Sequence, residues 1–470
     1  MPNEFTIEAK LDRPAVLAGR TSEVYSLVTI QPNMERLGVL LESGVPSLPA
    51  HLVVIVDVSD SMKVLIEPDP KAKIVSQRIV EGDMRSVVET TVPTRLVVAM
   101  RVVQKLVERM DPTDRMTLVA FDDTVFPLAE AMPPGAALQA IVATLANMGG
   151  GGTRIGRAFE NVRKSLLRTQ TGERTEAVTR RIVLLTDGED HDPFGALKEA
   201  QRLGSEYHVP IVAFGLGESH ADFLMDVCKT TLGGSFDDIR SEHDAEDCFS
   251  KFLTGQKNIL ATKVSLQLWL APEIYVRELY RTKPELLFVG DLLPDASNSV
   301  PIAIEYMERG KRYEFLFRSK IAARDPGRFR LAKATLTYDV PALGISEERV
   351  EANIVVEYTS DEGRAQVRSG DVRKVIADAE TQQQLLHLNK MRELLITGKA
   401  TEKDRTEIAK LLDGLVKKFK ERGDAANENL YRQLQTEYAA KGDITQEMMN
   451  RSLAASSKVD GGLVEVDIEF

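Results

Sequence analysis

The chain has 470 residues, of which 43% are hydrophobic and 28% are charged, with 31 glycines and 20 prolines. At roughly 150 residues per domain, this length predicts about three domains, and the composition is that of a globular protein. The 60 Lys and Arg residues against 71 Asp and Glu give a formal net charge of -11, which argues against nucleic acid or an anionic membrane as the main partner.

Other features of the composition indicate the compartment. Two cysteines, Cys228 and Cys248, are too few for a disulfide framework, and the histidines show no zinc-ligand spacing. Both cysteines are expected in the core, where they could face each other without forming a disulfide. The amino terminus lacks the features of a secretory signal, and no apolar run reaches the ~20 residues of a membrane helix. We therefore expect a cytoplasmic protein without membrane insertion.

Residues 1–46 are predicted to form β-strands. Residues 5–11 alternate between apolar and polar side chains, and residues 24–30 are rich in β-branched and aromatic side chains. A two-stranded ribbon is marginally stable by itself. We therefore expect these strands to complete a sheet formed later in the chain, by residues 261–365.

Residues 47–260 alternate between strands and helices. Buried strands are predicted at 52–56, 116–121, 182–185 and 211–214, and helices at 96–110, 137–148, 155–168 and 193–207. Apolar strands alternating with amphipathic helices are typical of a parallel sheet covered on both faces. A turn at Asp122 and Asp123 predicts that one edge strand is antiparallel. The expected fold is a doubly wound α/β domain.

Two further regions follow the α/β domain. Residues 261–365 return to alternating strands, which predicts an antiparallel β-sandwich in which the α/β domain is inserted or which flanks it. Residues 371–457 predict a bundle of three or four helices, with stops at Gly398, Gly423 and Gly442 and capping-box spacing from Thr401 to Asp404. Residues 458–470 alternate acidic and apolar side chains and are predicted to be a tail or an added strand.

Oxygen-bearing side chains follow the buried strands of the α/β domain. Asp57, Ser59 and Ser61 alternate after the first strand, so an extended segment presents all three on one side. Thr153 follows four glycines, and Asp187 follows the strand at 182–185. Ligands of open α/β sheets bind at the carboxyl ends of the strands. Two carboxylates and three hydroxyls form a set of hard oxygen ligands suited to Mg²⁺, Mn²⁺ or Ca²⁺.

This pattern resembles the metal-ion-dependent adhesion site of von Willebrand factor A domains, over residues 50 to 255. The resemblance implies that Asp57, Ser59, Ser61, Thr153 and Asp187 hold a divalent ion and that an Asp or Glu of a protein partner completes its coordination. It further implies a non-enzymatic interaction module in a scaffold; intracellular members of the family often act as adaptors, sometimes beside AAA+ ATPases.

Several alternatives remain open from the sequence. Asp and Ser are common in turns and helix caps, so Ser59 or Ser61 could cap the next element. A second function class is a Mg²⁺-dependent phosphoryl-transfer or hydrolytic enzyme with Asp57 as nucleophile, although Ser59 stands where such enzymes carry a second aspartate. A third is a secreted adhesin, which the absence of a signal and of disulfides disfavours.

Residues 63–93 depart from the family pattern, because the first helix is expected soon after the first metal-binding loop. This insertion contains strand-like segments at 74–80 and 86–92. It is either a hairpin that shapes or covers the partner surface or a loop without function. The acidic loop at 188–192 either tunes the metal site or is an exposed, solvated loop.

Overall fold

The computed structural model describes residues 4–33, 36–37, 48–80, 83–170, 178–188, 190–217, 221–231, 233–291 and 293–457. Contacts within the chain define two compact units. One unit is Ser47–Ile259, and the other combines Met1–Pro46 with Leu260–Phe470. The predicted tail, 458–470, lies outside the described residues.

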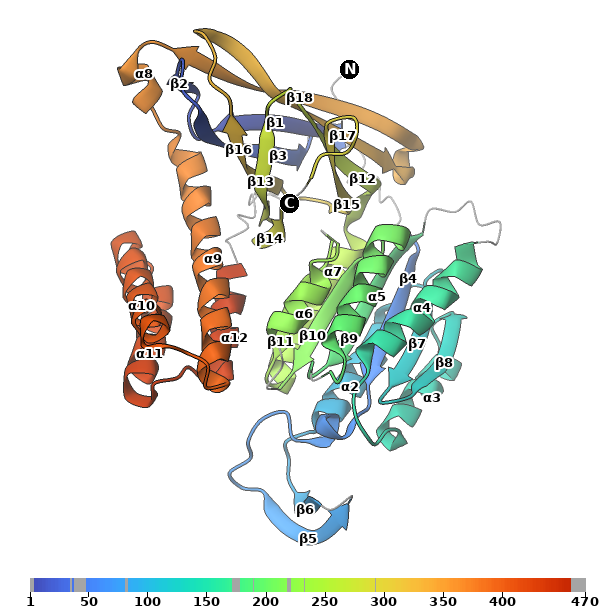
Figure 1. Ribbon diagram of the computed structural model, residues 1–470. Coiled ribbons are helices and arrows are strands. Elements are labelled where there is room, and N and C mark those ends of the chain that lie inside the picture. The colour runs from blue at the N-terminus through green and yellow to red at the C-terminus, as the bar shows by residue number, and fades with distance from the viewer. Residues whose placement is uncertain are drawn as a thin grey trace, which may run out of the picture. The chain divides into compact units, whose positions relative to one another are not determined.

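The first unit contains a six-stranded sheet in the order β11-β10-β9-β4-β7-β8 (Figure 1). Five strands are parallel and β8 is antiparallel to β7, which confirms the predicted hairpin at the edge. Every residue of the central strand β4 is buried, because helices cover both faces of the sheet. The strands are β4 (Ala50–Asp57), β7 (Arg115–Phe121), β8 (Val125–Met132), β9 (Thr179–Thr186), β10 (Ile211–Leu216) and β11 (Ser235–Ile239).

Successive residues of β4 point into two separate apolar layers. Val54 and Val56 pack with α2 (Arg95–Arg109), α3 (Ala136–Thr144) and α7 (Glu242–Lys257). Val53 and Ile55 pack with α4 (Ile155–Gln170), α5 (Pro193–Tyr207) and α6 (Ala221–Cys228). A short 3-10 turn, η2 (Leu145–Asn147), follows α3.

The two cysteines belong to different layers of this unit. Cys228 packs in the layer of α4, α5 and α6, whereas Cys248 packs against the layer of α2, α3 and α7. They therefore do not face each other, which the sequence had left possible, because their helices lie on opposite faces of the sheet.

The 63–93 insertion forms an antiparallel hairpin of β5 (Lys73–Val80) and β6 (Asp83–Glu89), which stands apart from the sheet in Figure 1. It begins after the 3-10 turn η1 (Asp60–Lys63), which follows β4. The amide of Ile66 donates to the carbonyl of Pro93 at 3.0 Å, and the amide of Arg95 donates to the carbonyl of Val64 at 3.0 Å. These bonds close the base of the insertion beside the carboxyl end of β4.

The second unit contains two five-stranded sheets, ordered β1-β3-β16-β13-β14 and β15-β12-β17-β18-β2. The N-terminal strand β3 pairs with β16, so the two separate chain segments of this unit contribute to one sheet. The rings of Phe5 and Tyr338 lie 4.8 Å apart and join one sheet to the other. The strands are β1 (Phe5–Leu11), β2 (Ala15–Leu17), β3 (Ser22–Pro32), β12 (Ile259–Leu270), β13 (Tyr275–Lys283), β14 (Leu287–Gly290), β15 (Ser299–Glu308), β16 (Tyr313–Ile321), β17 (Gly327–Val340) and β18 (Ile345–Thr359).

One pair in these sheets differs from the antiparallel expectation. β2 pairs with β18 in parallel. It has only three residues and sits at the sheet edge, where a short parallel pair, slightly weaker than an antiparallel one, costs little.

The remaining elements of this unit are helical, apart from the 3-10 turn η3 (Pro341–Leu343). They are α8 (Glu362–Gln366), α9 (Gly370–Ile396), α10 (Glu402–Arg422), α11 (Ala425–Lys441) and α12 (Gln446–Ser457). Thr401 and Asp404 form the predicted capping box of α10, and Gly423 and Gly442 end α10 and α11 in the left-handed conformation. The described helices include none with the length and apolarity needed to span a membrane. The structure confirms the predicted fold class.

Candidate metal centre

The centre of the candidate site is Asp57, the last residue of β4, whose side chain is completely buried. Its Oδ1 accepts a hydrogen bond from the amide of Ser59 at 2.9 Å. Its Oδ2 accepts one from the hydroxyl of Thr186, at the end of the neighbouring strand β9, at 2.6 Å. The carboxylate is therefore fixed between two adjacent strand ends.

Burial and, to a smaller extent, the nearby charge of Asp187 raise the pKa of Asp57 from 3.8 to about 7, against the lowering effect of the hydrogen bonds from Ser59 and Thr186. Two carboxylates this close in a water-excluded place repel each other. The carboxyl ends of β4 and β9 thus form a place where a positive charge would be strongly stabilised.

The two serines of the loop after β4 lie together. Ser59 is buried, and its hydroxyl lies 3.0 Å from the hydroxyl of Ser61. Ser59 is the residue before η1, but its hydroxyl makes no capping hydrogen bond to that turn. Capping, the alternative considered from the sequence, therefore does not account for the Ser59 hydroxyl.

The glycine run lies directly against the loop after β4. Gly149 has a φ of +86°, and a Cβ at this position would lie 1.7 Å from the carbonyl oxygen of Val58, so only glycine fits. Asp60 fixes the next part of the run, because its amide donates to the carbonyl of Gly151 at 3.3 Å and its Oδ2 accepts from the Gly151 amide at 3.4 Å. The glycines thereby let the segment before Thr153 approach the loop that carries Ser59 and Ser61.

Thr153 is buried, and its carbonyl accepts a hydrogen bond from the amide of His191 at 3.1 Å. His191 belongs to the loop between β9 and α5. The chain around Thr153 therefore contacts the loop after β4 on one side and the loop that follows Asp187 on the other. The structure brings all five predicted residues to one edge of the sheet.

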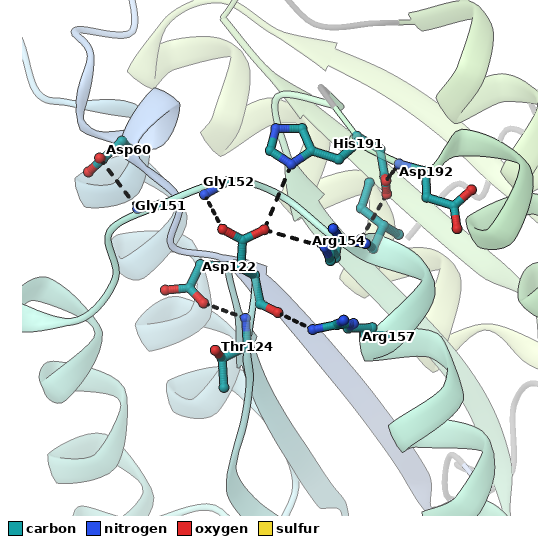
Figure 2. Close-up of polar contacts among 12 residues, drawn as sticks. Asp60, Asp122, Thr124, Gly151, Gly152, Arg154, Arg157, His191 and Asp192 are labelled. Atoms are coloured by element: carbon teal, nitrogen blue, oxygen red, sulfur yellow. Dashed lines mark hydrogen bonds and ion pairs between the residues drawn. The ribbon is translucent and has the colours of Figure 1, made fainter. Parts of the chain in front are cut away.

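Asp123, which the sequence placed only in a hairpin turn, organises the glycine run from a third loop. Its Oδ2 accepts from the amide of Gly152 at 2.8 Å, and this bond holds the pKa of Asp123 below its usual value. Its Oδ1 lies 3.5 Å from Nε of Arg154 and 3.7 Å from Nδ1 of His191. In Figure 2, dashed lines from Gly152, Arg154 and His191 meet at one unlabelled carboxylate, which these distances identify as that of Asp123.

Arg95 is a site residue that the sequence did not reveal. It is the first residue of α2, and its Nη1 lies 2.9 Å from Oδ2 of Asp187. The same nitrogen lies 3.5 Å from the carbonyl oxygen of Ser61. The side chains of Arg95 and Asp187 are only 13% and 3% exposed. Asp187, one of the predicted metal ligands, is therefore already engaged in a buried ion pair with Arg95.

Two acids of the loop after Asp187 accept hydrogen bonds from backbone amides at the N-termini of α4 and α5. Oδ2 of Asp190 accepts from the amide of Ile155 at 2.8 Å, at the start of α4. Oδ1 of Asp192 accepts from the amide of Gly195 at 3.0 Å and caps α5. Asp192 is exposed and Asp190 is half-buried, and each also satisfies a backbone donor at a helix start. Glu189 lies outside the described residues.

Residues 89–247 match the family model "von Willebrand factor type A domain". This part of the chain is a von Willebrand factor type A (VWA) domain. The match includes Thr153 and Asp187, and it starts at the end of the inserted hairpin, so Asp57, Ser59 and Ser61 precede it. No curated protein sequence matches the chain.

Two solved structures resemble the whole chain. A von Willebrand factor type A protein from Catenulispora acidiphila aligns over 97% of both chains with a TM-score of 0.71 and 15% identity. The ArnB paralog VWA2 from Sulfolobus acidocaldarius aligns over 98% of this chain and 100% of its own, with a TM-score of 0.53 and 13% identity. At these identities the likeness establishes the fold alone: the VWA domain and the flanking β and helical regions form an architecture that other proteins share.

Proposed function

We propose that the VWA domain binds a divalent cation, Mg²⁺ or else Mn²⁺ or Ca²⁺, and uses it to capture an acidic side chain of a protein partner. VWA domains commonly mediate protein–protein interactions. The observation that carries the proposal is the buried Asp57 carboxylate, placed beside Asp187 and next to the paired hydroxyls of Ser59 and Ser61.

The chemistry of the donor set supports this assignment. The donors would be the carboxylates of Asp57 and Asp187 and the hydroxyls of Ser59, Ser61 and Thr153. Hard oxygen donors of this kind suit Mg²⁺, Mn²⁺ and Ca²⁺. Burying two neighbouring carboxylates is unfavourable unless a positive charge compensates them.

Each part of the site has a distinct task in this proposal. Asp57 and Asp187 balance the charge of the cation, while the three hydroxyls orient around it. When bound, the ion would supply an open coordination position for an Asp or Glu of the partner. The bond from Thr186 and the contacts of Asp60 and Asp123 with the glycine run keep the three loops in place.

We further propose that the chain is a non-enzymatic scaffold. In the phosphoryl-transfer alternative, Asp57 would attack the substrate, but both of its oxygens accept hydrogen bonds in a buried position. Ser59, which stands in place of a second acid, hydrogen-bonds Ser61. We also propose that the chain is cytoplasmic and that its partner belongs to an AAA+ ATPase assembly. Identification of the partner would test both proposals.

Affinity capture with a matched pair of threonine variants tests this function. The full-length chain, Thr153→Ala and Thr144→Ala would each be immobilised and exposed to cell extract with Mg²⁺ or with EDTA. Thr144 is an exposed threonine whose hydroxyl bonds the carbonyl of Ile141 in the same helix, so its replacement controls for loss of a hydroxyl outside the site.

We expect a partner retained with Mg²⁺ by the wild type and by Thr144→Ala, and lost with EDTA or in Thr153→Ala. The same partner should be released by free glutamate at high concentration, because it would compete for the open position. Retention that is equal with EDTA and in Thr153→Ala would contradict metal-dependent capture and favour a metal-free scaffold.

A further inference from the structure

Arg95 lies inside the proposed metal site and yet is dispensable as a helix cap. The N-cap of α2 is Thr94, whose hydroxyl accepts from the amide of Val97 at 3.3 Å. The guanidinium of Arg95 instead contacts Oδ2 of Asp187 and the carbonyl of Ser61. Arg95 therefore pairs with the carboxylate of Asp187 and does not cap the helix.

The surroundings of Arg95 hold its side chain at this place. Gly217, at the end of β10, has a φ of +74°, and a Cβ at this position would lie 2.5 Å from Nε of Arg95. Nε is buried and has no hydrogen-bond partner among the described residues. Nε of Arg95 thus gives up a hydrogen bond to water. The ion pair between the guanidinium and Asp187 offsets this loss.

We propose that Arg95 is a resident counter-cation that competes with the metal ion for Asp187. In the metal-free chain it neutralises this carboxylate, and in the metal-bound chain it weakens the ion's attraction to the site. This inference rests on the proposed function, since it concerns the same site. Arg95 is a positioning residue that lowers the affinity of the site for metal. A higher free metal concentration is therefore needed to occupy the site than if Arg95 were absent.

The competition follows from elementary electrostatics. A unit charge within about 4 to 6 Å changes the equilibrium of a neighbouring charged group by roughly ten- to a thousand-fold. Arg95 contributes such a charge to Asp187 in the absence of metal. A divalent ion on the same carboxylate would be repelled by the guanidinium and would have to share or replace its hydrogen bond.

The first test uses metal-free, full-length protein. Arg95→Gln should lower the unfolding temperature of the VWA domain in EDTA, because Asp187 loses its cation. The same replacement in an Asp187→Asn background should have little effect, since no charge remains to be neutralised. The control is Arg101→Gln: Arg101 lies in the same helix, is 47% exposed and pairs with Glu242, so its loss should change little.

The second test measures Mg²⁺ and Mn²⁺ affinity by calorimetric titration. Arg95→Gln should bind the ion at least about tenfold more tightly than the wild type, because the competing charge is gone. Arg95→Lys, which keeps the charge, should stay within about threefold of the wild type. Saturating metal should also restore the thermal stability that Arg95→Gln loses in EDTA.

The outcomes separate this inference from the proposed function. If the wild type binds metal and Arg95→Gln binds no more tightly, the competition does not occur and the inference is overturned alone. If neither protein binds Mg²⁺ or Mn²⁺, both the inference and the metal-dependent function fail. An Arg95→Gln effect on stability that persists in the Asp187→Asn background would show that Arg95 acts through packing, which also overturns the inference.

Discussion

Replacing Asp57 by Asn should stabilise the metal-free VWA domain above neutral pH. The replacement keeps the size of the side chain but removes its charge. Asp57 is completely buried, and burial together with the charge of Asp187 raises its pKa from 3.8 to about 7. The folded chain therefore resists ionisation of this group, whereas the unfolded chain does not.

The magnitude follows from the pKa change. At about 1.36 kcal/mol per pKa unit, ionising Asp57 in the folded state costs about 4 kcal/mol. Asp57→Asn avoids this cost, but its single amide oxygen can accept only one of the bonds that Ser59 and Thr186 donate, which costs about 1 to 2 kcal/mol. The variant should therefore be more stable than the wild type by roughly 2 to 3 kcal/mol at pH 8.

The sign of the pH dependence is fixed by the raised pKa. The contribution of Asp57 to stability is complete below its unfolded pKa near 4 and is lost as the pH rises through about 7. Well below pH 4, where the carboxyl is protonated in both states, the variant should gain nothing. The advantage of Asp57→Asn should grow as the pH rises from about 4 to about 7 and then level off.

The measurement is urea unfolding of the full-length chain in EDTA at pH 5, 6, 7 and 8. Trp269, the single tryptophan, lies on β12 in the other unit, so a probe within this domain is required. Pulsed hydrogen exchange of peptides from β4 and β9, labelled at one fixed pH, reports the unfolding of this domain. A variant that is less stable than the wild type at every pH, with parallel curves, would refute the electrostatic account of Asp57.

Three further changes test other parts of the site. Asp187→Ala should destabilise the metal-free chain by about 2 kcal/mol in thermal unfolding, because it leaves the buried charge of Arg95 unpaired. This is the opposite of the effect expected for Asp57→Asn. Equal or higher stability of Asp187→Ala would contradict the importance of the ion pair between Arg95 and Asp187. Gly149→Ala should cost at least about 2 kcal/mol by the same assay, since its Cβ would clash with a backbone carbonyl at 1.7 Å, and an unchanged melting temperature would mean that the loop adapts. Asp123→Ala should lower metal affinity by about tenfold in calorimetry, because the amide of Gly152 loses its acceptor; unchanged affinity would remove Asp123 from the site.

Much of the α/β domain was predictable because its signals are local. β4 and β9 are uninterrupted apolar runs, and α5 begins at Pro193 behind the N-cap Asp192. The segment after β10 gave no such prediction. β11, whose sequence is Ser-Phe-Asp-Asp-Ile, is a half-buried edge strand without regular alternation, so only its pairing with β10 defines it.

The β-sheets of the other unit illustrate a second limit. β12 and β18 contain long stretches in which more and less buried residues alternate, and such alternation is the basis of the predicted sandwich over residues 261–365. β13 shows no such regularity, because register shifts interrupt its pairing with β16 and Glu278 has a positive φ. Sequence periodicity fails wherever a bulge turns successive residues to the same face.

The candidate donors were predictable from their places at strand ends, whereas their neighbours were not. Arg95 contacts Asp187 across 92 positions of sequence, and Asp123 contacts Gly152 across 29. No local pattern links such residues, because their proximity depends on how α2 and the hairpin after β7 pack on the sheet. The metal itself stays a prediction.

Calorimetric titration of chelator-stripped, full-length protein with Mg²⁺ and Mn²⁺ tests the central claim most directly. It would be run beside Asp57→Ala and beside Asp114→Asn, a buried aspartate whose Oδ1 accepts from the amide of Ala50 at the opposite end of β4. The account predicts one saturable site in the wild type and in Asp114→Asn, lost in Asp57→Ala. Equal binding by Asp57→Ala, or no binding by any of the three, would contradict it.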